Sequence, residues 1–245
     1  MDFITRSIVL LVFFATTATS ADIFLEWHVS LGLNDDLVSE NKLVIAINGM
    51  FPGPLINATT NDIIHVNVFN GYIEPVLFTW YMVLYVFNVF VLDLEMVLEL
   101  NMQNYGFVMH RNGIQQRQNS WQDGVSGTNC PIQPQTNWTY VFETKDQIGT
   151  FFYFPSINFL KAGGGFGPIR VNNRAVISVP FPKPEAEFDL LIGDWYNRSY
   201  MDVRDRLDTM DIVSPSWMLI NGKGPYMNNF SKTYETFNVT QGKKK

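Results

Sequence analysis

The stretch Ile63-Ile-His-Val-Asn-Val-Phe-Asn70 decides the fold class, because its side chains alternate between apolar and polar. Ile64, Val66 and Val68 share one face of an extended chain, so this strand is predicted to have one side in a core. Short apolar runs recur from Ile23 onward, separated by turn-forming pairs such as Asn48-Gly49. The sequence therefore predicts an all-β sandwich, with strands over 23–30, 42–47, 63–70, 76–80, 138–143, 149–154 and 166–171.

The overall composition is that of a globular protein with an acidic balance. The chain has 245 residues, of which 47% are hydrophobic and 15% aromatic, enough for one large all-β domain or somewhat more. Its formal net charge is -6 and its pI is about 5.0. A surface of this sign cannot neutralise phosphates, so nucleic acid is excluded as an expected partner.

The N-terminal residues 1–21 have the pattern of a secretory signal peptide. Arg6 precedes the apolar run Ile8–Ala15, and small residues follow at 18–21. That apolar run is too short for a membrane span, which requires about 20 residues. We therefore expect a secreted glycoprotein, carrying N-glycosylation sequons at Asn57, Asn137, Asn197, Asn229 and Asn238.

A proline-rich stretch at 178–184 reads as a linker between two domains, because proline cannot donate to a regular strand ladder. A first domain is thus expected over 22–177. Beyond the linker, 185–245 is expected to hold the first part of a second domain. Its predicted elements are strands over 188–195, 217–222 and 235–240 and a short helix over 198–207.

Four motifs together carry a resemblance to a known family. They are Ile47-Asn-Gly-Met-Phe-Pro-Gly-Pro54, Asn119-Ser-Trp-Gln-Asp-Gly-Val-Ser-Gly-Thr-Asn-Cys-Pro-Ile132, Lys145-Asp-Gln-Ile-Gly-Thr-Phe-Phe-Tyr153 and Leu191-Ile-Gly-Asp-Trp-Tyr196. The chain resembles the ascorbate-oxidase-like subfamily of plant multicopper oxidases, including the monocopper-oxidase-like members of pollen and cell wall. This resemblance implies cupredoxin-like (plastocyanin-like) Greek-key sandwiches, three in a full-length member, of which this chain would hold the first and part of the second.

The resemblance also locates four positions where the first domain of such an oxidase supplies copper-binding histidines. Here those positions hold Thr79, Asn112, Phe154 and Ser156. Imidazole suits copper, whereas a phenyl ring has no donor atom and a neutral hydroxyl is a poor ligand. The three histidines present, His28, His65 and His110, show no metal-binding spacing. We therefore expect no bound copper and no catalytic residues in this chain, although copper is the cofactor of the family.

Residues 81–111 lie between Thr79 and Asn112, the first two of these four positions, and match nothing in the family pattern. They begin with the apolar run Tyr81–Leu92. The Trp80 codon followed by any Tyr codon contains GT, the usual start of an intron, and 31 codons of three nucleotides each make 93 nucleotides, a plausible plant intron. We hypothesise that this segment is translated intron sequence or a gene-model error rather than a natural insertion. The intron hypothesis requires an AGG codon for Arg111.

Cys130 is the sole cysteine of the chain. In a secreted protein it is either buried and inert or paired with a cysteine on sequence absent here, and we expect the second.

Three functions follow as hypotheses. The first is a secreted, non-catalytic protein of the apoplast or cell wall that binds wall carbohydrate or a wall protein, in pollen or tip growth by resemblance. The second is a copper-binding oxidoreductase of the ascorbate oxidase type. The third is a non-functional product of a retained intron in a truncated gene model.

Overall fold

The computed structural model describes residues 20–33, 43–82, 113–116, 118–174, 178, 182, 184–209, 211, 213–224, 234–239 and 241. Outside these residues lie 1–19 of the expected signal peptide, most of the 81–111 segment, Asn112, Asn229, His110 and most of the 178–184 linker. In the part described, no helix is both long and apolar enough to cross a membrane.

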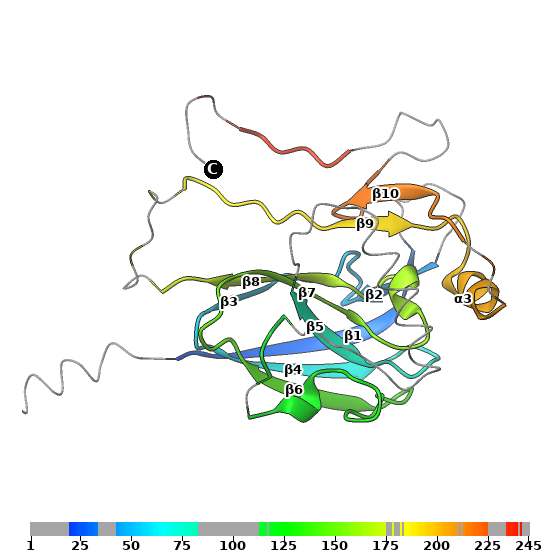
Figure 1. The fold of residues 1–245 in the computed structure, drawn as a ribbon, viewed down its shortest axis with the longest axis horizontal. Coiled ribbons are helices and arrows are strands. Elements are labelled where there is room, and N and C mark those ends of the chain that lie inside the picture. The colour runs from blue at the N-terminus through cyan, green and yellow to red at the C-terminus, as the bar shows by residue number, and fades with distance from the viewer. Residues whose placement is uncertain are drawn as a thin grey trace, which may run out of the picture.

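Two four-stranded sheets pack face to face (Figure 1). The first has the order β2-β1-β4-β6 and contains β1 (Asp22–Leu33), β2 (Leu43–Ile47), β4 (Ile63–Asn70) and β6 (Asn137–Glu143). The second has the order β3-β8-β7-β5 and contains β3 (Ile56–Thr59), β5 (Phe78–Met82), β7 (Gly149–Pro155) and β8 (Gly167–Asn172). Strands β1 and β4 are parallel, as are β3 and β8, while the remaining pairs are antiparallel.

The alternation in β4 works as predicted: its buried residues alternate with half-buried ones along the whole strand. The buried face packs against an aromatic core between the sheets. Within it, the Trp27 ring lies 4.4 Å from that of Tyr153, and the Trp80 ring lies 4.4 Å from that of Phe142. Rings of this size bury large apolar areas, so they dominate the stability of the sandwich.

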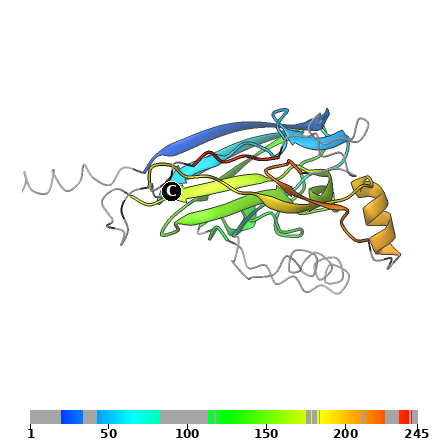
Figure 2. The same ribbon diagram turned by 90° about the horizontal axis from the view of Figure 1, so that it is seen from above.

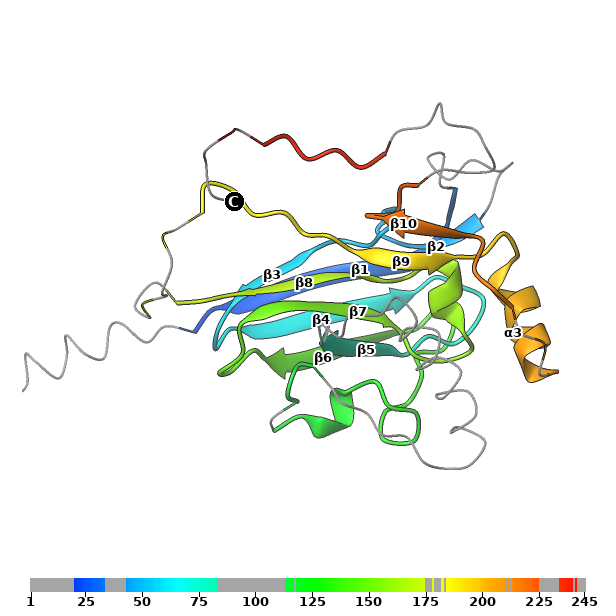
Figure 3. The same cartoon turned by 45° about the horizontal axis from the view of Figure 1, so that its top comes forward.

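Beyond the sandwich the chain forms β9 (Ile192–Trp195), α3 (Tyr200–Asp208) and β10 (Trp217–Ile220), with β9 and β10 paired antiparallel. Ser199 caps α3, its hydroxyl accepting the Asp202 amide at 3.2 Å. The pair β9/β10 runs along one face of the sandwich and α3 lies across its end (Figures 2 and 3). Two short 3-10 turns, η1 (Ser120–Gln122) and η2 (Leu160–Gly163), complete the described elements.

Several predicted boundaries need correction. Strand β5 begins at Phe78 rather than at Val76, whose only ladder contact is an isolated bridge to Ile132. Strand β9 is limited to Ile192–Trp195, and β3 was not predicted. The strand expected over 235–240 is wrong for its described residues: among 234–239 there is no strand, and Glu235 instead contacts Asn221 and Lys223 through its side chain.

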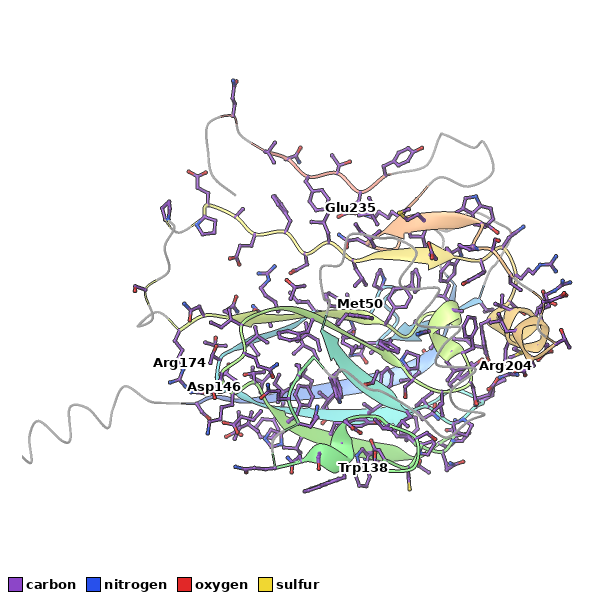
Figure 4. The ribbon with its side chains drawn as sticks, viewed as in Figure 1. Met50, Trp138, Asp146, Arg174, Arg204 and Glu235 are labelled. Atoms are coloured by element: carbon purple, nitrogen blue, oxygen red, sulfur yellow. The ribbon has the colours of Figure 1, made fainter. Side chains whose placement is uncertain are left out.

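Helix α3 docks on the sandwich through the carboxylate of Glu74. Glu74 accepts hydrogen bonds from Tyr200 Oη at 2.8 Å and from the Arg204 guanidinium at 3.0 Å. Tyr72 donates to the Tyr200 hydroxyl in the same cluster. Arg204 is seen at this end of the sandwich in Figure 4. These contacts connect the residues beyond the linker to the turn that follows β4.

Alkaline pH is expected to unfold the protein, because burial raises the pKa of Tyr140, Tyr153 and Tyr200 above the usual phenol value of 10.0. The unfolded chain releases these protons near pH 10 while the folded chain retains them. The stability is therefore complete below about pH 10 and is lost as the pH rises further. Thermal midpoints measured from pH 8 to 11 should fall steeply above about pH 10, and Tyr153→Phe should reduce that slope. A flat profile would contradict the assignment.

Two described residues on either side of the 81–111 segment, Trp80 and Ile114, are in contact. The Trp80 carbonyl accepts the Ile114 amide at 3.3 Å, and the Ile114 side chain is completely buried in the core. Tyr81 and Met82 continue β5 in register with Phe152 and Phe151. If residues 81–111 were removed, Trp80 and Ile114 would stand three positions apart, and the same hydrogen bond would close a β-turn with Asn-Gly at its centre.

Excision of residues 81–111 is therefore expected to preserve the sandwich and raise its free energy of unfolding by about 1–2 kcal/mol. Shortening a closed loop from 33 residues to 2 gains about 2 kcal/mol in chain entropy, which the lost strand pairs of Tyr81 and Met82 partly offset. Urea denaturation of the two proteins measures the difference. An excised protein that fails to fold would show that the segment is an integral part of the domain.

Candidate functional site

Strands β5 and β7 bring three of the four expected ligand positions together. Thr79 on β5 pairs directly with Phe154 on β7, and Ser156 follows the end of β7. Thr79 and Phe154 are buried, with 1% and 5% of their surface exposed, and Ser156 is half-buried. Asn112, the fourth position, lies outside the described residues. The motif alignment thus identified a real spatial cluster.

Hydrogen bonds to one loop define what this cluster does. Trp80 Nε1 donates to the carbonyl oxygen of Gln122 at 3.2 Å, and Thr79 Oγ1 to that of Asp123 at 2.8 Å. Ser156 Oγ donates to the carbonyl oxygen of Gly124 at 2.7 Å. We call these three bonds the carbonyl clamp. Three successive carbonyls of the 122–124 loop are therefore held by side chains of the two strands.

Gly124 is the residue that allows the loop to approach β5 so closely. Its φ angle is +78°, and a Cβ placed on it would lie 1.9 Å from the carbonyl oxygen of Phe78. Only glycine combines this backbone conformation with such an approach. The loop backbone thus lies directly on the backbone of β5.

The same loop is fixed to the opposite sheet. Gln122 Oε1 accepts the amide of Val141 on β6 at 2.5 Å, and Asn119 Nδ2 donates to the Val141 carbonyl at 2.9 Å. Because β5 and β6 are the edge strands of their sheets, the loop closes the sandwich along this side. Covering two adjacent strand edges also protects them from pairing with other chains.

The donor set at these positions does not fit copper. The protons of both hydroxyls are directed to carbonyl oxygens, and Phe154 offers no lone pair. The ammonium group of Lys161 lies 4.7 Å from the centre of the Phe154 ring, so this ring is in contact with a positive charge of the protein itself. Among the described residues, no three His, Cys, Asp or Glu side chains group as a metal site.

The two described histidines lie elsewhere, on the outer face of the first sheet. His65 on β4 stacks on Phe24 at 4.5 Å, and its Nε2 is 3.0 Å from the carboxylate of Asp22. His28 on β1 packs beside Phe69 at 5.5 Å. Both histidines therefore lie on the face of the first sheet that points away from the second sheet, which contains Thr79.

Loss of the clamp hydroxyls is expected to destabilise the protein moderately. Thr79→Val and Ser156→Ala should each lower the free energy of unfolding by about 1–2 kcal/mol, because each leaves a carbonyl without its donor. Thr128→Val, which removes an exposed hydroxyl of the same loop, serves as the matched control and should change stability by less than about 0.5 kcal/mol. Urea denaturation measures the stability of all three variants. Unchanged stability of Thr79→Val and Ser156→Ala would show that the carbonyl clamp does not stabilise the fold.

The remaining predicted sites lie at the surface. Asn57, Asn137, Asn197 and Asn238 are all exposed, as N-glycosylation requires, and their occupancy stays a prediction.

Cys130 is exposed, so the alternative of a buried, inert thiol is wrong, and its pairing with a cysteine outside this sequence stays a prediction.

The clamp acceptors were missed by sequence reasoning because they are backbone atoms. Within 122–124, the pair Asp123-Gly124 is the sequence feature that favours a turn with positive φ. The motif containing it indicated the family and gave no sign of its structural role.

Family models match most of the described residues, from β2 onward. A family model described as multicopper oxidase matches residues 34–88 and 93–176, and a second with the same description matches 187–245. The first match omits only 89–92 within the 81–111 segment, so the segment does not form one uninterrupted break in the family pattern.

Plant proteins are among the relatives. Monocopper oxidase-like protein SKS1 of Arabidopsis thaliana is 49% identical over 82% of this chain, and SKU5 of the same plant is 47% identical over 82%. An L-ascorbate oxidase homolog of Brassica napus is 42% identical over 80%. The chain spans about 30% of the length of each of these relatives. The resemblance read from the four motifs is confirmed.

Solved structures confirm the cupredoxin-like sandwich. Fet3p, a multicopper oxidase that functions in iron import, superposes with a TM-score of 0.63 at 18% identity, covering 82% of this chain and 33% of that one. The laccase from Botrytis aclada superposes with a TM-score of 0.59 at 22% identity, covering 89% and 34%. At these identities the likeness concerns the fold alone.

Proposed function

Because this chain belongs to the multicopper oxidase family, yet two of its four expected ligand positions, Thr79 and Ser156, donate hydrogen bonds to loop carbonyls, we propose that it belongs to a secreted, glycosylated protein that does not oxidise substrates. It acts in the plant apoplast or cell wall by binding wall carbohydrate or a wall protein. Pollen and other growing walls are its proposed setting, from its likeness to plant monocopper oxidase-like proteins.

The carbonyl clamp is the observation that carries this proposal. Thr79 and Ser156 stand at positions that would supply imidazoles in an oxidase, and each donates its proton to the loop instead. A residue that closes the sandwich in this way has a structural task that accounts for its presence. The exposed sequons support secretion and glycosylation.

Expression of the tagged chain in plant cells tests both parts. We expect the protein in the apoplastic wash or wall fraction, and we expect oxygen uptake with ascorbate or a simple phenol no faster than that of a heat-denatured sample. Copper-dependent oxygen uptake by the purified chain would contradict the non-oxidising role. Retention and degradation inside the cell would contradict secretion and favour a product without function.

A further inference from the structure

A row of three side chains crosses the outer face of the first sheet. His28 on β1 pairs with Phe69 on β4, and Phe69 pairs with Asn137 on β6. Phe69 and Asn137 point away from the core, because the buried residues of β4 and β6 lie at even-numbered positions, and His28 is exposed between buried Trp27 and Val29. His28 and Asn137 are exposed and Phe69 is half-buried. An aromatic ring therefore stands directly opposite the asparagine of a sequon.

Phe69 and Asn137 face each other at the shorter of the two cross-strand spacings of an antiparallel pair. The Asn70 amide donates to the Thr136 carbonyl at 2.9 Å, so the neighbouring pair of Phe69 and Asn137 is a non-hydrogen-bonded pair. Side chains in such pairs have Cβ atoms about 4.5–5.5 Å apart. A group attached to the Asn137 amide thus begins beside the Phe69 ring.

The amide of Asn137 is also oriented. Its Nδ2 donates to Asn67 Oδ1 at 3.0 Å, and Asn67 is held in turn by Glu26, whose carboxylate accepts the Asn67 amide at 2.7 Å. An asparagine that carries a sugar retains one hydrogen on Nδ2, which can still be donated to Asn67 Oδ1. The direction in which the sugar leaves the sheet is then fixed by Asn67 rather than left to free rotation.

We propose that Asn137 is N-glycosylated and that the first N-acetylglucosamine packs its apolar face on Phe69, covering the row formed with His28. In the modification, Nδ2 attacks the anomeric carbon of an oligosaccharide linked to a lipid diphosphate. The Nδ2–C1 bond forms, the bond from C1 to the diphosphate oxygen breaks, and the amide proton leaves with the diphosphate. This inference rests on the proposed secretion.

A second exposed sequon provides the internal control. Asn57 on β3 faces Arg170 on β8, and its Oδ1 accepts a hydrogen bond from Asn172 at 2.7 Å. Its cross-strand partner is thus a charged side chain, without a ring for a sugar to pack on. A glycan at Asn57 should gain nothing from an aromatic neighbour.

The experiment uses the chain secreted from a glycosylating eukaryotic host. Mass spectrometry of peptides gives the occupancy of each sequon, and proton NMR of the glycan tests ring packing. We expect Asn137 to be occupied and the protons of its first sugar to be shifted upfield by the Phe69 ring. Phe69→Leu should abolish that shift without changing the occupancy.

Thermal midpoints give an independent readout. Removing the sequon by Asn137→Gln should lower the midpoint by about 2–4 °C, the effect of one packed ring contact in a domain of this size. In the Phe69→Leu background the same change should lower the midpoint by less, because only the hydrogen bond of Asn137 to Asn67 is then lost. Asn57→Gln should have the same effect in both backgrounds.

Each adverse outcome overturns a different claim. An unoccupied Asn137 beside other occupied sequons overturns this inference and leaves secretion intact, whereas a chain retained in the cell with no sequon occupied contradicts the proposed function. An occupied Asn137 whose sugar shows no ring shift and no dependence on Phe69 would place the glycan in solvent. The glycosylated chain could also bind a wall polysaccharide and lose that binding with Phe69→Leu. This result would show that Phe69 is accessible to other ligands and would contradict the proposal that the Asn137 sugar covers it.

Discussion

Replacing Trp80 with alanine is expected to lower the free energy of unfolding by about 4 kcal/mol. The indole is 1% exposed, and its ring lies 4.4 Å from that of Phe142 and 5.2 Å from that of Tyr140. The substitution opens a cavity where the two sheets meet. It also removes the clamp donor to the Gln122 carbonyl, so the expected loss lies in the upper part of the range for large core residues.

Trp121→Ala is the matched control for this change. Trp121 is a neighbour of the Gln122 acceptor but is 51% exposed, so its loss should change stability by less than about 1 kcal/mol. Urea denaturation of both variants, followed by tryptophan fluorescence and by circular dichroism, gives the comparison. Similar effects of the two substitutions would mean that Trp80 is not the centre of the core.

Gly124→Ala is expected to cost about 3 kcal/mol or more. Its Cβ would overlap the Phe78 carbonyl oxygen at 1.9 Å, so the loop must move off β5. That movement would break the bond from Ser156 to the Gly124 carbonyl and loosen the contact of Gln122 with β6. We therefore expect faster hydrogen exchange at the Val141 amide, which donates to Gln122, together with the loss of stability.

Gly127→Ala separates the close approach from the backbone conformation. Gly127 has a φ of +100° in the same loop, but a Cβ there meets nothing within 4 Å. Its substitution carries conformational strain alone and should cost about 1–2 kcal/mol. If the two alanine variants were equally stable, the contact between the loop and β5 would not exist in solution.

Local patterns predicted much of the fold. The alternation in Ile63–Asn70 gave β4 its bounds, and the short helix expected over 198–207 is found as α3 (Tyr200–Asp208). Strand β3 was missed because Ile56-Asn-Ala-Thr59 is short and owes its conformation to parallel pairing with β8, a contact distant in sequence. The strand expected over 235–240 was wrong for its described residues, because a strand also needs a neighbouring strand to pair with and a local sequence pattern does not provide one.

The site was predictable in position but not in role. The family resemblance identified Thr79, Phe154 and Ser156 as ligand positions, and β5 and β7 bring them together. The clamp was not predictable, because its acceptors are the carbonyls of residues 122–124, and every residue carries a carbonyl. The sequence shows that Thr79 and Ser156 stand where histidines are expected. Only the structure shows that their hydroxyls donate to loop carbonyls.

Copper content is the most direct test of the central claim that these positions serve structure and not metal. The purified, tag-free chain would be equilibrated with copper, dialysed, and measured by elemental analysis. We expect far less than one copper per chain, with the same value for Thr79→Val and Ser156→Ala. One or more tightly held copper ions per chain, reduced by either substitution, would contradict the account.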